Sequence, residues 1–436
     1  QVITGCEGSL VRTWNVETGK KVFEFHGTDG KDEMSCMFLE VNGRRLFTGS
    51  RTGMVYIWTS GNGQLLHKCL PEPGYEYEVT AIQPLPEKSY TLSVGWSRRI
   101  LMYHDHAEMM TVEADPSWKG GHVHEDDILC LGHCHPNLVA TGSFDGDLIL
   151  WSLERQNIFK RLKRGAGSLF KSKLKKVGLA AGSRKRLKSD SKQGTPIDAV
   201  LFFEKRANNK YSDSVILVSS QSGVLEFWSM FGPLRPRGCF SAACEADCVV
   251  LSLATDEDND ILVSGDSSGY VTVWDIREYC NSGLEMVATN AWLTSKRQST
   301  FGVKQECPPP QSRWQGHAMS VVSLQVVDHF QRRKFILSAS IDCTAKLWTV
   351  DGVPVGMFSQ GNVWNLRECS IPLSYQQRGK CETECGVMAA TSQKIRPHTS
   401  GADVITSQTN FRTTTESPFQ WRNEDSLGIE RSLTET

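Results

Sequence analysis

The chain is 436 residues long, with 39% hydrophobic residues, 22% charged residues and a net charge of −1, which is typical of a globular protein. No apolar run approaches the roughly 18–20 residues that a membrane-spanning helix needs, so the sequence predicts no membrane span. The 14 cysteines follow no disulfide-scaffold pattern, and we expect them to be reduced thiols that pack as small hydrophobes.

One pattern recurs from the first residues onward: an apolar strand, a turn of small residues, an alternating second strand and an aromatic residue. The stretch ATGSFDGDLILW at 140–151 shows it most fully. In chain order, the aromatic positions are Trp14, Trp58, Tyr103, Trp151, Trp228, Trp274 and Trp348. They are 44, 45, 48, 77, 46 and 74 residues apart, and four of these spacings approach the ~40–45 residues of a four-stranded propeller blade. A single hairpin cannot bury both of its faces, so we expect these units to stack in a ring.

The repeats resemble WD repeats, which are named for a Trp-Asp pair that this chain keeps in VWDI at 273–276. In that family a histidine, a serine or threonine, a turn aspartate and the tryptophan form a hydrogen-bonded tetrad. The resemblance implies tetrads of His122, Thr141, Asp145 and Trp151 in the fourth blade, and of His317, Ser338, Asp342 and Trp348 in the seventh. Elsewhere the Asp position holds Gly8, Thr52, Ser97, Ser222 and Ser268. We interpret the tryptophan as packing and the aspartate as a supplementary lock on the turn.

The predicted fold is therefore all-β: a seven-bladed WD-type β-propeller over residues 1–360, with long insertions at about 156–194 and 280–313. Residue 1 falls in the middle of a repeat, so blade one lacks its innermost strand, and we expect residues upstream of the chain to supply it. Residues 361–436 are rich in Ser, Thr and Gln. We expect this C-terminal tail to be largely irregular and to make no core of its own.

The first insertion is strongly basic. Residues 160–192 hold 13 Lys or Arg against one Asp, a net charge of +12 that leaves −13 for the rest of the chain. Like-charge repulsion should keep such a segment extended. It could lie as a solvated loop on its own acidic propeller, contact an acidic protein surface such as tubulin, or bind nucleic acid or a phospholipid surface. The candidate contact residues are Lys160, Arg161, Lys163, Arg164, Lys171, Lys173, Lys175, Lys176, Arg184, Lys185, Arg186 and Lys188.

Fragments that suggest chemistry are weak. GDSSG at 265–269 resembles a serine protease nucleophile segment, but it occupies a hairpin turn and no matching His segment is present. CLGHCH, with Cys130, His133, Cys134 and His135, has metal-ligand residue types at a spacing too compact for a paired-ligand zinc site. Strand alternation should scatter these four side chains. The sequence therefore predicts no catalytic residues, no metal site, no cofactor and no enzyme activity.

SQGNVWNL at 359–366 resembles a junction in WD-repeat proteins of ciliary axonemes. We expect a non-enzymatic protein-interaction scaffold in the cytoplasm, with a cilium, axoneme or other microtubule setting implied by that resemblance. The alternative is a nuclear or RNA-associated WD-repeat scaffold that uses the basic segment 160–192 for import or phosphate binding.

Overall fold

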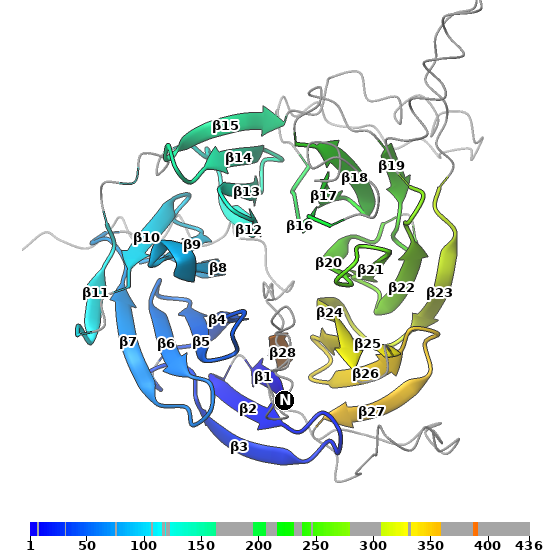
Figure 1. The fold of residues 1–436 in the computed structure, drawn as a ribbon, viewed down its shortest axis with the longest axis horizontal. Coiled ribbons are helices and arrows are strands. Elements are labelled where there is room, and N and C mark those ends of the chain that lie inside the picture. Colours follow the sequence, from blue (N-terminus) through cyan, green and yellow to red (C-terminus); the bar gives the residue numbers. More distant parts are fainter. Residues whose placement is uncertain are drawn as a thin grey trace, which may run out of the picture.

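The computed structural model describes residues 1–162 (except 7, 31, 75, 106–107, 116–117 and 119–122), 195–205, 216–230, 238–279 (except 246), 307–329, 333–358 and 387–390. Their strands form seven sheets arranged in a ring around a central axis (Figure 1). This confirms the predicted all-β, seven-bladed propeller. In this described part the one helical segment is a single 3-10 turn, η1 (Pro86–Lys88), and no helix there has the length and apolar character needed to cross a membrane.

We number the blades in chain order, starting from the sheet that holds β1. Blade 1 contains β1 (Val2–Cys6), β2 (Leu10–Trp14), β3 (Lys21–His26) and β28 (Val387–Ala390). Blade 2 contains β4 (Met34–Leu39), β5 (Arg45–Ser50), β6 (Val55–Thr59), β7 (Leu65–Leu70) and β11 (Thr111–Glu113). Blade 3 contains β8 (Val79–Leu85), β9 (Tyr90–Gly95) and β10 (Ile100–His104). Blade 4 contains β12 (Ile128–Cys134), β13 (Leu138–Ser143), β14 (Leu148–Ser152) and β15 (Asn157–Leu162).

The second half of the ring repeats the four-stranded plan. Blade 5 contains β16 (Ala199–Phe203), β17 (Ile216–Gln221), β18 (Val224–Ser229) and β19 (Gly238–Ser241). Blade 6 contains β20 (Val250–Thr255), β21 (Ile261–Asp266), β22 (Tyr270–Asp275) and β23 (Pro310–Gln315). Blade 7 contains β24 (Val321–His329), β25 (Arg333–Ser340), β26 (Ala345–Thr349) and β27 (Pro354–Phe358).

The hydrophobic core is divided among the contacts between neighbouring blades. The described residues form seven buried clusters, and each draws its members from two adjacent blades. In every cluster the repeat aromatic of one blade packs against the blade before it. Trp58, for example, shares a cluster with Ile3 and Val11 of blade 1, and the ring of Trp14 lies 6.0 Å from that of Phe358 in blade 7. The recurring aromatic is therefore the contact that joins consecutive blades and closes the ring.

A β-bulge recurs at the same aromatic position. Where the third strand of a blade pairs with the fourth, the register shifts at the bond that precedes the tryptophan in blades 1, 2, 4, 6 and 7. In blade 4, for instance, the shift falls between Leu150 and Trp151. A bulge bends its strand and increases the local twist. The repeated bulge thus gives each blade the same curvature next to its buried aromatic.

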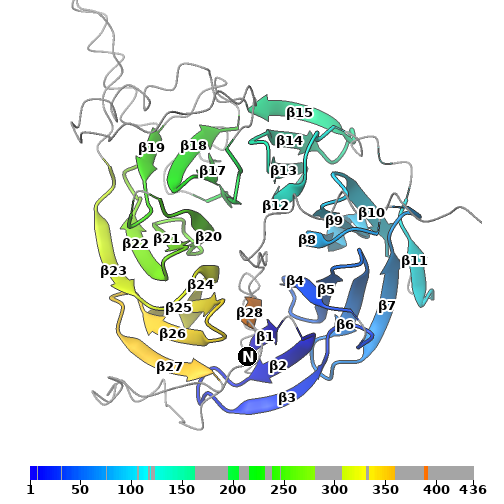
Figure 2. The same ribbon diagram turned by 180° about the vertical axis from the view of Figure 1, so that it is seen from behind.

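In this structure a strand from the C-terminal tail lies at the inner edge of blade 1. β28 pairs antiparallel with β1, with Ile3 opposite Ala390 and Cys6 opposite Val387. Figure 2 shows β28 beside β1 at the inner side of the ring. The expectation that upstream residues supply this strand is not tested by this pairing and stays a prediction. The inner edge of β1 needs backbone partners, and any extended segment that reaches it can provide them.

Blade 3 departs from the four-stranded plan within the described residues. The segment that follows β10 crosses to blade 2, where β11 pairs in parallel with β7. The backbone N–H of Lys68 donates to Met110 O at 2.8 Å, and the N–H of Asp115 donates to Met102 O at 2.7 Å. One segment is thereby hydrogen-bonded to blade 2 at one end and to blade 3 at the other.

Both predicted insertions are shorter than the sequence suggested. Residues 157–162 form β15, the outer strand of blade 4, and residues 310–313 belong to β23, the outer strand of blade 6. Lys160 and Arg161 led the sequence analysis to assign β15 to the basic insertion. An outer strand exposes one face to water, however, where lysine and arginine are tolerated. The rest of both insertions, at 163–194 and 280–306, lies outside the described residues.

Candidate functional site

Four side chains of blade 7 form one continuous hydrogen-bonded chain. Trp348 Nε1 donates to Ser338 Oγ at 2.8 Å, and the Ser338 hydroxyl lies 2.7 Å from His317 Nε2. His317 Nδ1 lies 3.0 Å from Asp342 Oδ2, which also accepts the backbone N–H of Ala318 at 3.0 Å. The structure therefore brings together the four residues that the sequence assigned to the blade 7 tetrad.

Burial and hydrogen bonding set the protonation of this network. Burial lowers the pKa of His317, so the ring is neutral near pH 7 even beside Asp342. Burial alone would raise the pKa of Asp342, but hydrogen bonds from His317, Thr344 and the Ala318 N–H hold that pKa well below its usual range. A neutral His317 that donates from Nδ1 and accepts at Nε2 lets every group in the chain find a partner.

Blade 4 uses a different histidine from the one the sequence assigned. Thr141 Oγ1 accepts from Trp151 Nε1 at 2.7 Å, and His124 Nε2 lies 2.7 Å from the same oxygen. His122 lies outside the described residues, so the histidine found at this position is His124. Asp145 bonds within its own turn, and His124 Nδ1 is buried without a partner among the described residues. The sequence GHVH at 121–124 contains two histidines that are two residues apart. The local sequence does not show which of them bonds to Thr141.

The bond from tryptophan to hydroxyl persists where the rest of the tetrad is absent. Its donors and acceptors are Trp14 and Thr4 at 2.8 Å, Trp58 and Thr48 at 2.9 Å, and Trp274 and Ser264 at 2.9 Å. In each blade the hydroxyl lies ten residues before the tryptophan. Blade 5 has Val218 at that position, yet its Trp228 is only 2% exposed, and Tyr103 of blade 3 is 1% exposed. Packing of the aromatic is thus independent of the polar network.

The sequence analysis did not predict the aspartate that stabilises the hairpin turn of blade 6. In blade 6, Asp266 Oδ1 accepts the backbone N–H groups of Ser268 and Tyr270, both at 3.0 Å. Asp266 lies two residues before the position where the pattern places the aspartate, which Ser268 occupies. The Asp-Ser-Ser-Gly order is a signal for such an Asx turn, since a short acidic side chain can accept from the backbone two residues later. GDSSG is accordingly a hairpin turn in this fold.

Lys160 and Arg161, the first two basic residues of the segment 160–192, bond to other residues of the propeller. Arg161 forms an ion pair with Asp147, with Nε 2.7 Å from Oδ2, and its Nη2 lies 3.4 Å from Val123 O. Lys160 Nζ donates to Met230 O at 3.3 Å. These residues are therefore poor candidates for partner contact. The other ten candidate residues, from Lys163 to Lys188, lie outside the described residues.

A central channel with a volume of about 790 Å³ runs between the inner strands. Its walls expose both polar and apolar atoms, and Leu39, Leu131 and Leu253 are among the apolar lining residues. Polar lining residues include Ser252, whose hydroxyl donates to Val321 O at 2.9 Å and so is held by a neighbouring blade. Toward the ends of β8, β12 and β16, the lining includes the ionisable residues Glu87, His133, His135 and Glu204.

Of the four ligand-type residues of CLGHCH, Cys130, His133 and Cys134 are in β12, and His135 follows in the next turn. Cys130 and Cys134 belong to the core cluster between blades 4 and 5. Burial raises the pKa of both thiols, that of Cys134 to about 12, so neither is a thiolate near pH 7. Leu131, which shares the parity of His133, packs toward blade 3. The cysteines and the histidines therefore do not form one site, as strand alternation predicted.

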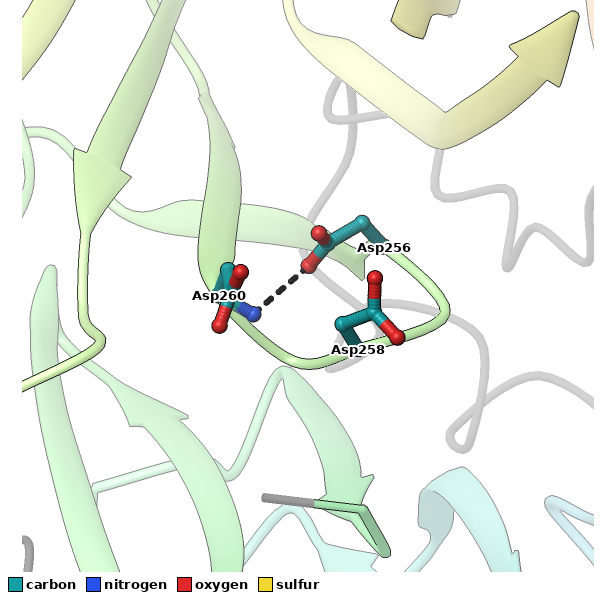
Figure 3. A group of neighbouring side chains, drawn as sticks. All are labelled: Asp256, Asp258 and Asp260. Carbon is teal, nitrogen blue, oxygen red and sulfur yellow. Dashed lines mark hydrogen bonds between the residues drawn. The ribbon is translucent and has the colours of Figure 1, made fainter. Parts of the chain in front are cut away.

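Three carboxylates gather in the loop between β20 and β21, where the ligand atoms of Asp256, Asp258 and Asp260 lie within 4.8 Å of one another (Figure 3). Asp256 is only 3% exposed, and its Oδ1 accepts the backbone N–H of Asp260 at 2.8 Å. Its Oδ2 forms an ion pair with Lys334 of blade 7. The lysine supplies the positive charge that the buried carboxylate needs. These contacts assign the loop a structural role that joins blades 6 and 7.

Comparison with known families gives matches that follow the repeat. The family model "WD domain, G-beta repeat" matches residues 119–152, 236–275 and 308–349. Each match ends one residue after a repeat tryptophan, namely Trp151, Trp274 and Trp348. Two of the three matched segments hold the histidine–hydroxyl–tryptophan contacts described above, in blades 4 and 7.

Curated relatives are similar over most of this chain. It is 27% identical over 360 residues to the WD repeat-containing protein on Y chromosome of Drosophila virilis, covering 73% of this chain and 29% of that protein. It is 24% identical over 389 residues to the protein of the same name from Anopheles gambiae, covering 79% of this chain and 34% of that one. The chain thus spans about a third of the length of these relatives. A solved structure, the computationally designed Ika8 protein, aligns at 17% identity and a TM-score of 0.49 over 82% of this chain and 83% of that one.

Proposed function

Because this chain is a WD-repeat β-propeller, we propose that it acts as a non-enzymatic scaffold that presents loops to protein partners. The observation that carries this proposal is the division of the core into seven clusters among the described residues, each shared by two blades. Such a ring is rigid, while its connecting loops are free to vary. A rigid frame with variable loops suits recognition of several partners at once.

The basic insertion is the segment that we propose as a partner contact. Residues 163–192 hold 11 Lys or Arg and one Asp, so they keep a net charge of +10 after Lys160 and Arg161 are assigned to the propeller. The described residues on either side are anchored, since Leu162 and Ile197 are 2% and 3% exposed in the cluster between blades 4 and 5. The propeller thus holds both ends of a cationic segment in place.

The partner that we propose is an acidic protein surface, with tubulin in a ciliary or other microtubule setting as the specific case. Charge complementarity supports it, because clustered lysine and arginine side chains attract acidic surfaces and accelerate encounter. Nucleic acid is the alternative occupant of the same segment, in a nuclear or RNA-associated setting. The two differ in how binding responds to competitors, so a direct experiment separates them.

The experiment compares three forms of the chain in co-sedimentation with microtubules. One form is intact, one lacks 163–192, and a control lacks 281–305, a similar length from the second insertion with three basic residues and one Glu. We expect binding by the intact chain and the control, and loss of binding on deletion of 163–192. Equal pelleting of all three forms, or of none, contradicts the tubulin proposal. Release of bound chain by single-stranded RNA, with steep salt dependence, favours the nucleic-acid alternative.

A further inference from the structure

Blades 2, 3 and 4 repeat one hydrogen bond on the same face of the ring. Adjacent strands of a blade are antiparallel, so the turn between its second and third strands lies on the face where the chain enters the blade from its neighbour. The first N–H of each turn donates to the carbonyl of an acidic residue in the entering segment: Arg51 to Glu33 O at 3.1 Å, Trp96 to Glu78 O at 3.0 Å, and Phe144 to Asp127 O at 2.8 Å. The bond therefore places one acidic residue at the same position in three consecutive blades.

This face is acidic well beyond those three residues. We define the acidic face as the described residues of the segments 27–33, 71–78 and 123–127 and of the turns 51–54, 96–99 and 144–147. It holds 11 Asp or Glu against three Arg. The described turns on the opposite side of the same blades, at 40–44, 60–64, 86–89, 135–137 and 153–156, hold three Glu against three Lys or Arg. Negative charge is thus concentrated on one of the two faces of these blades.

The acidic face carries the side-chain types that bind lysine and arginine. Its carboxylates accept guanidinium groups within the fold, as where Arg51 Nη1 lies 2.6 Å from Glu33 Oε2. Tyr77 and Trp96 are 51% and 36% exposed, and exposed aromatic rings attract cations. The two aromatic residues belong to one region, because the Trp96 N–H bonds to Glu78, the residue after Tyr77. Carboxylates and ring faces together suit a peptide rich in Lys and Arg.

The basic segment 163–192 leaves the propeller at this same face. Before it, Leu162 pairs with Leu148, the first residue after the blade 4 turn of the acidic face. After it, the N–H of Ile197 donates at 3.1 Å to the carbonyl of Ser143, the last residue before that turn. The described residues on either side of the segment therefore flank one turn of the acidic face.

We propose that the acidic face is a docking surface for a Lys- and Arg-rich peptide, and that the chain's own segment 163–192 occupies it when no partner is bound. Charge complementarity supports this contact, because the segment carries a net charge of +10 and the acidic face one of −8. The length of chain also suffices. The 32 residues from 163 to 194 span ~105 Å when extended, so a loop that leaves and returns beside one turn reaches ~50 Å across the face.

Attachment at both ends makes the contact intramolecular. The effective concentration of such a segment at its own surface is of the order of millimolar, so exposed ion pairs that are individually weak can keep it docked. The consequence, which rests on the proposed function, is that an acidic partner must displace the acidic face before it binds the segment. The propeller thereby weakens partner binding and favours partner surfaces of high charge density.

Carbodiimide cross-linking of the intact chain tests the contact, because it joins a lysine amine to a touching carboxylate with loss of water. Mixing labelled with unlabelled chain lets mass spectrometry separate links within one chain from links between two. We expect links within one chain from lysines of 163–192 to Glu76 and Glu125, which are exposed on the acidic face. These links should disappear in about 1 M salt, where the Debye length falls to ~3 Å.

Glu257 and Asp258 are the reference carboxylates, since both are exposed in the loop between β20 and β21, on the opposite face of the ring. The proposal is overturned if the segment gives no links to the acidic face, or if it links to the reference carboxylates as often.

A matched pair of double variants measures release of the segment. E76Q/E125Q should speed trypsin cleavage within 163–192 by about 2-fold or more, because fewer carboxylates hold the segment. E257Q/D258N should leave the rate unchanged, and equal rates in both variants and the unaltered chain contradict the proposal. A chain that shows the cross-links and the trypsin effect, yet does not pellet with microtubules, supports the docking and refutes the tubulin proposal alone.

Discussion

His317 Nδ1 lies 3.0 Å from the carboxylate of Asp342, whereas in the described part of the chain His124, the matching ring in blade 4, is buried with no partner on its Nδ1. The histidine–aspartate hydrogen bond is thus present in blade 7, and its counterpart is not found in the described part of blade 4. The pair gives a direct comparison of what the aspartate contributes to stability.

The variant D342A should destabilise the propeller by about 2–3 kcal/mol, because the buried Nδ1–H of His317 and the N–H of Ala318 both lose their acceptor. Urea unfolding followed by tryptophan fluorescence measures the change. D145A in blade 4 is the matched control, since Asp145 makes no bond to His124. We expect a cost below ~1 kcal/mol there, and equal costs for the two variants would refute the interpretation.

The variant T141V should cost about 2–3 kcal/mol, because one oxygen serves both His124 Nε2 and Trp151 Nε1 and valine leaves the two nitrogens unpaired. Thr13 supplies the control. It is fully buried, and its hydroxyl has no hydrogen-bond partner in the part of the chain that the structure describes. T13V should therefore be neutral or slightly stabilising by the same unfolding measurement. A large loss in T13V would show that the valine shape, and not the hydrogen bond, governs the result.

Lys334 and Asp256 predict a third stability effect. The side chain of Asp256 is fully buried and pairs with Lys334 across the boundary between blades 6 and 7. K334M leaves an uncompensated buried carboxylate and should cost about 2–4 kcal/mol, while K334R should cost much less. Lys205 is the control: it lies 4.0 Å from Glu257, with 69% of its side chain exposed. K205M should change stability by less than ~0.5 kcal/mol.

The buried histidines predict a loss of stability in mild acid. Burial lowers the pKa of His124 to about 4, despite the opposing charges of Asp147 and Asp145. Below pH 6.5 the unfolded chain binds a proton that the folded chain does not, so stability falls as the pH drops from about 6.5 toward 4. This shift alone amounts to roughly 3 kcal/mol at pH 4, and the lowered pKa of His317 acts in the same direction.

Denaturant unfolding between pH 8 and pH 4 measures this effect, with pH 8 as the reference at which both rings are neutral. H124Q removes one titrating group, so its stability should fall less steeply between pH 6.5 and 4 than that of the unaltered chain. Parallel curves for the two proteins would rule out His124 as a contributor.

The pairing of β28 with β1 predicts a change in hydrogen exchange. Truncation after residue 386 removes the strand opposite Ile3 and Gly5, so the amides of β1 that face it should exchange faster. Mass spectrometry of the peptide at residues 1–6 reports the rate, and a peptide from β14 provides the unaffected reference. Unchanged exchange in residues 1–6 would mean that β28 does not protect β1.

Much of the fold follows from local pattern. The seven aromatic positions from Trp14 to Trp348 predicted the number of blades, because a strand pair that ends in an aromatic must bury it against a neighbour. The resemblance to WD repeats implied which histidine, hydroxyl and tryptophan meet in blade 7. It did not distinguish His122 from His124, because the partner of either histidine depends on how the connecting loop folds back. Asp266 was not predicted although its partners, the N–H groups of Ser268 and Tyr270, are local, because the repeat pattern places the aspartate two residues later.

The sequence by itself determined the repeating unit, since alternation of apolar and polar residues and the placing of turns act over a few neighbouring positions. Only the tertiary structure decided which distant segments lie together: β28 with β1, β11 with β7, and Glu87 beside His135. The reason is physical. Open strand edges and blade boundaries accept any compatible backbone or side chain. Closure of the ring therefore decides which distant segments pair, and a short stretch of sequence does not.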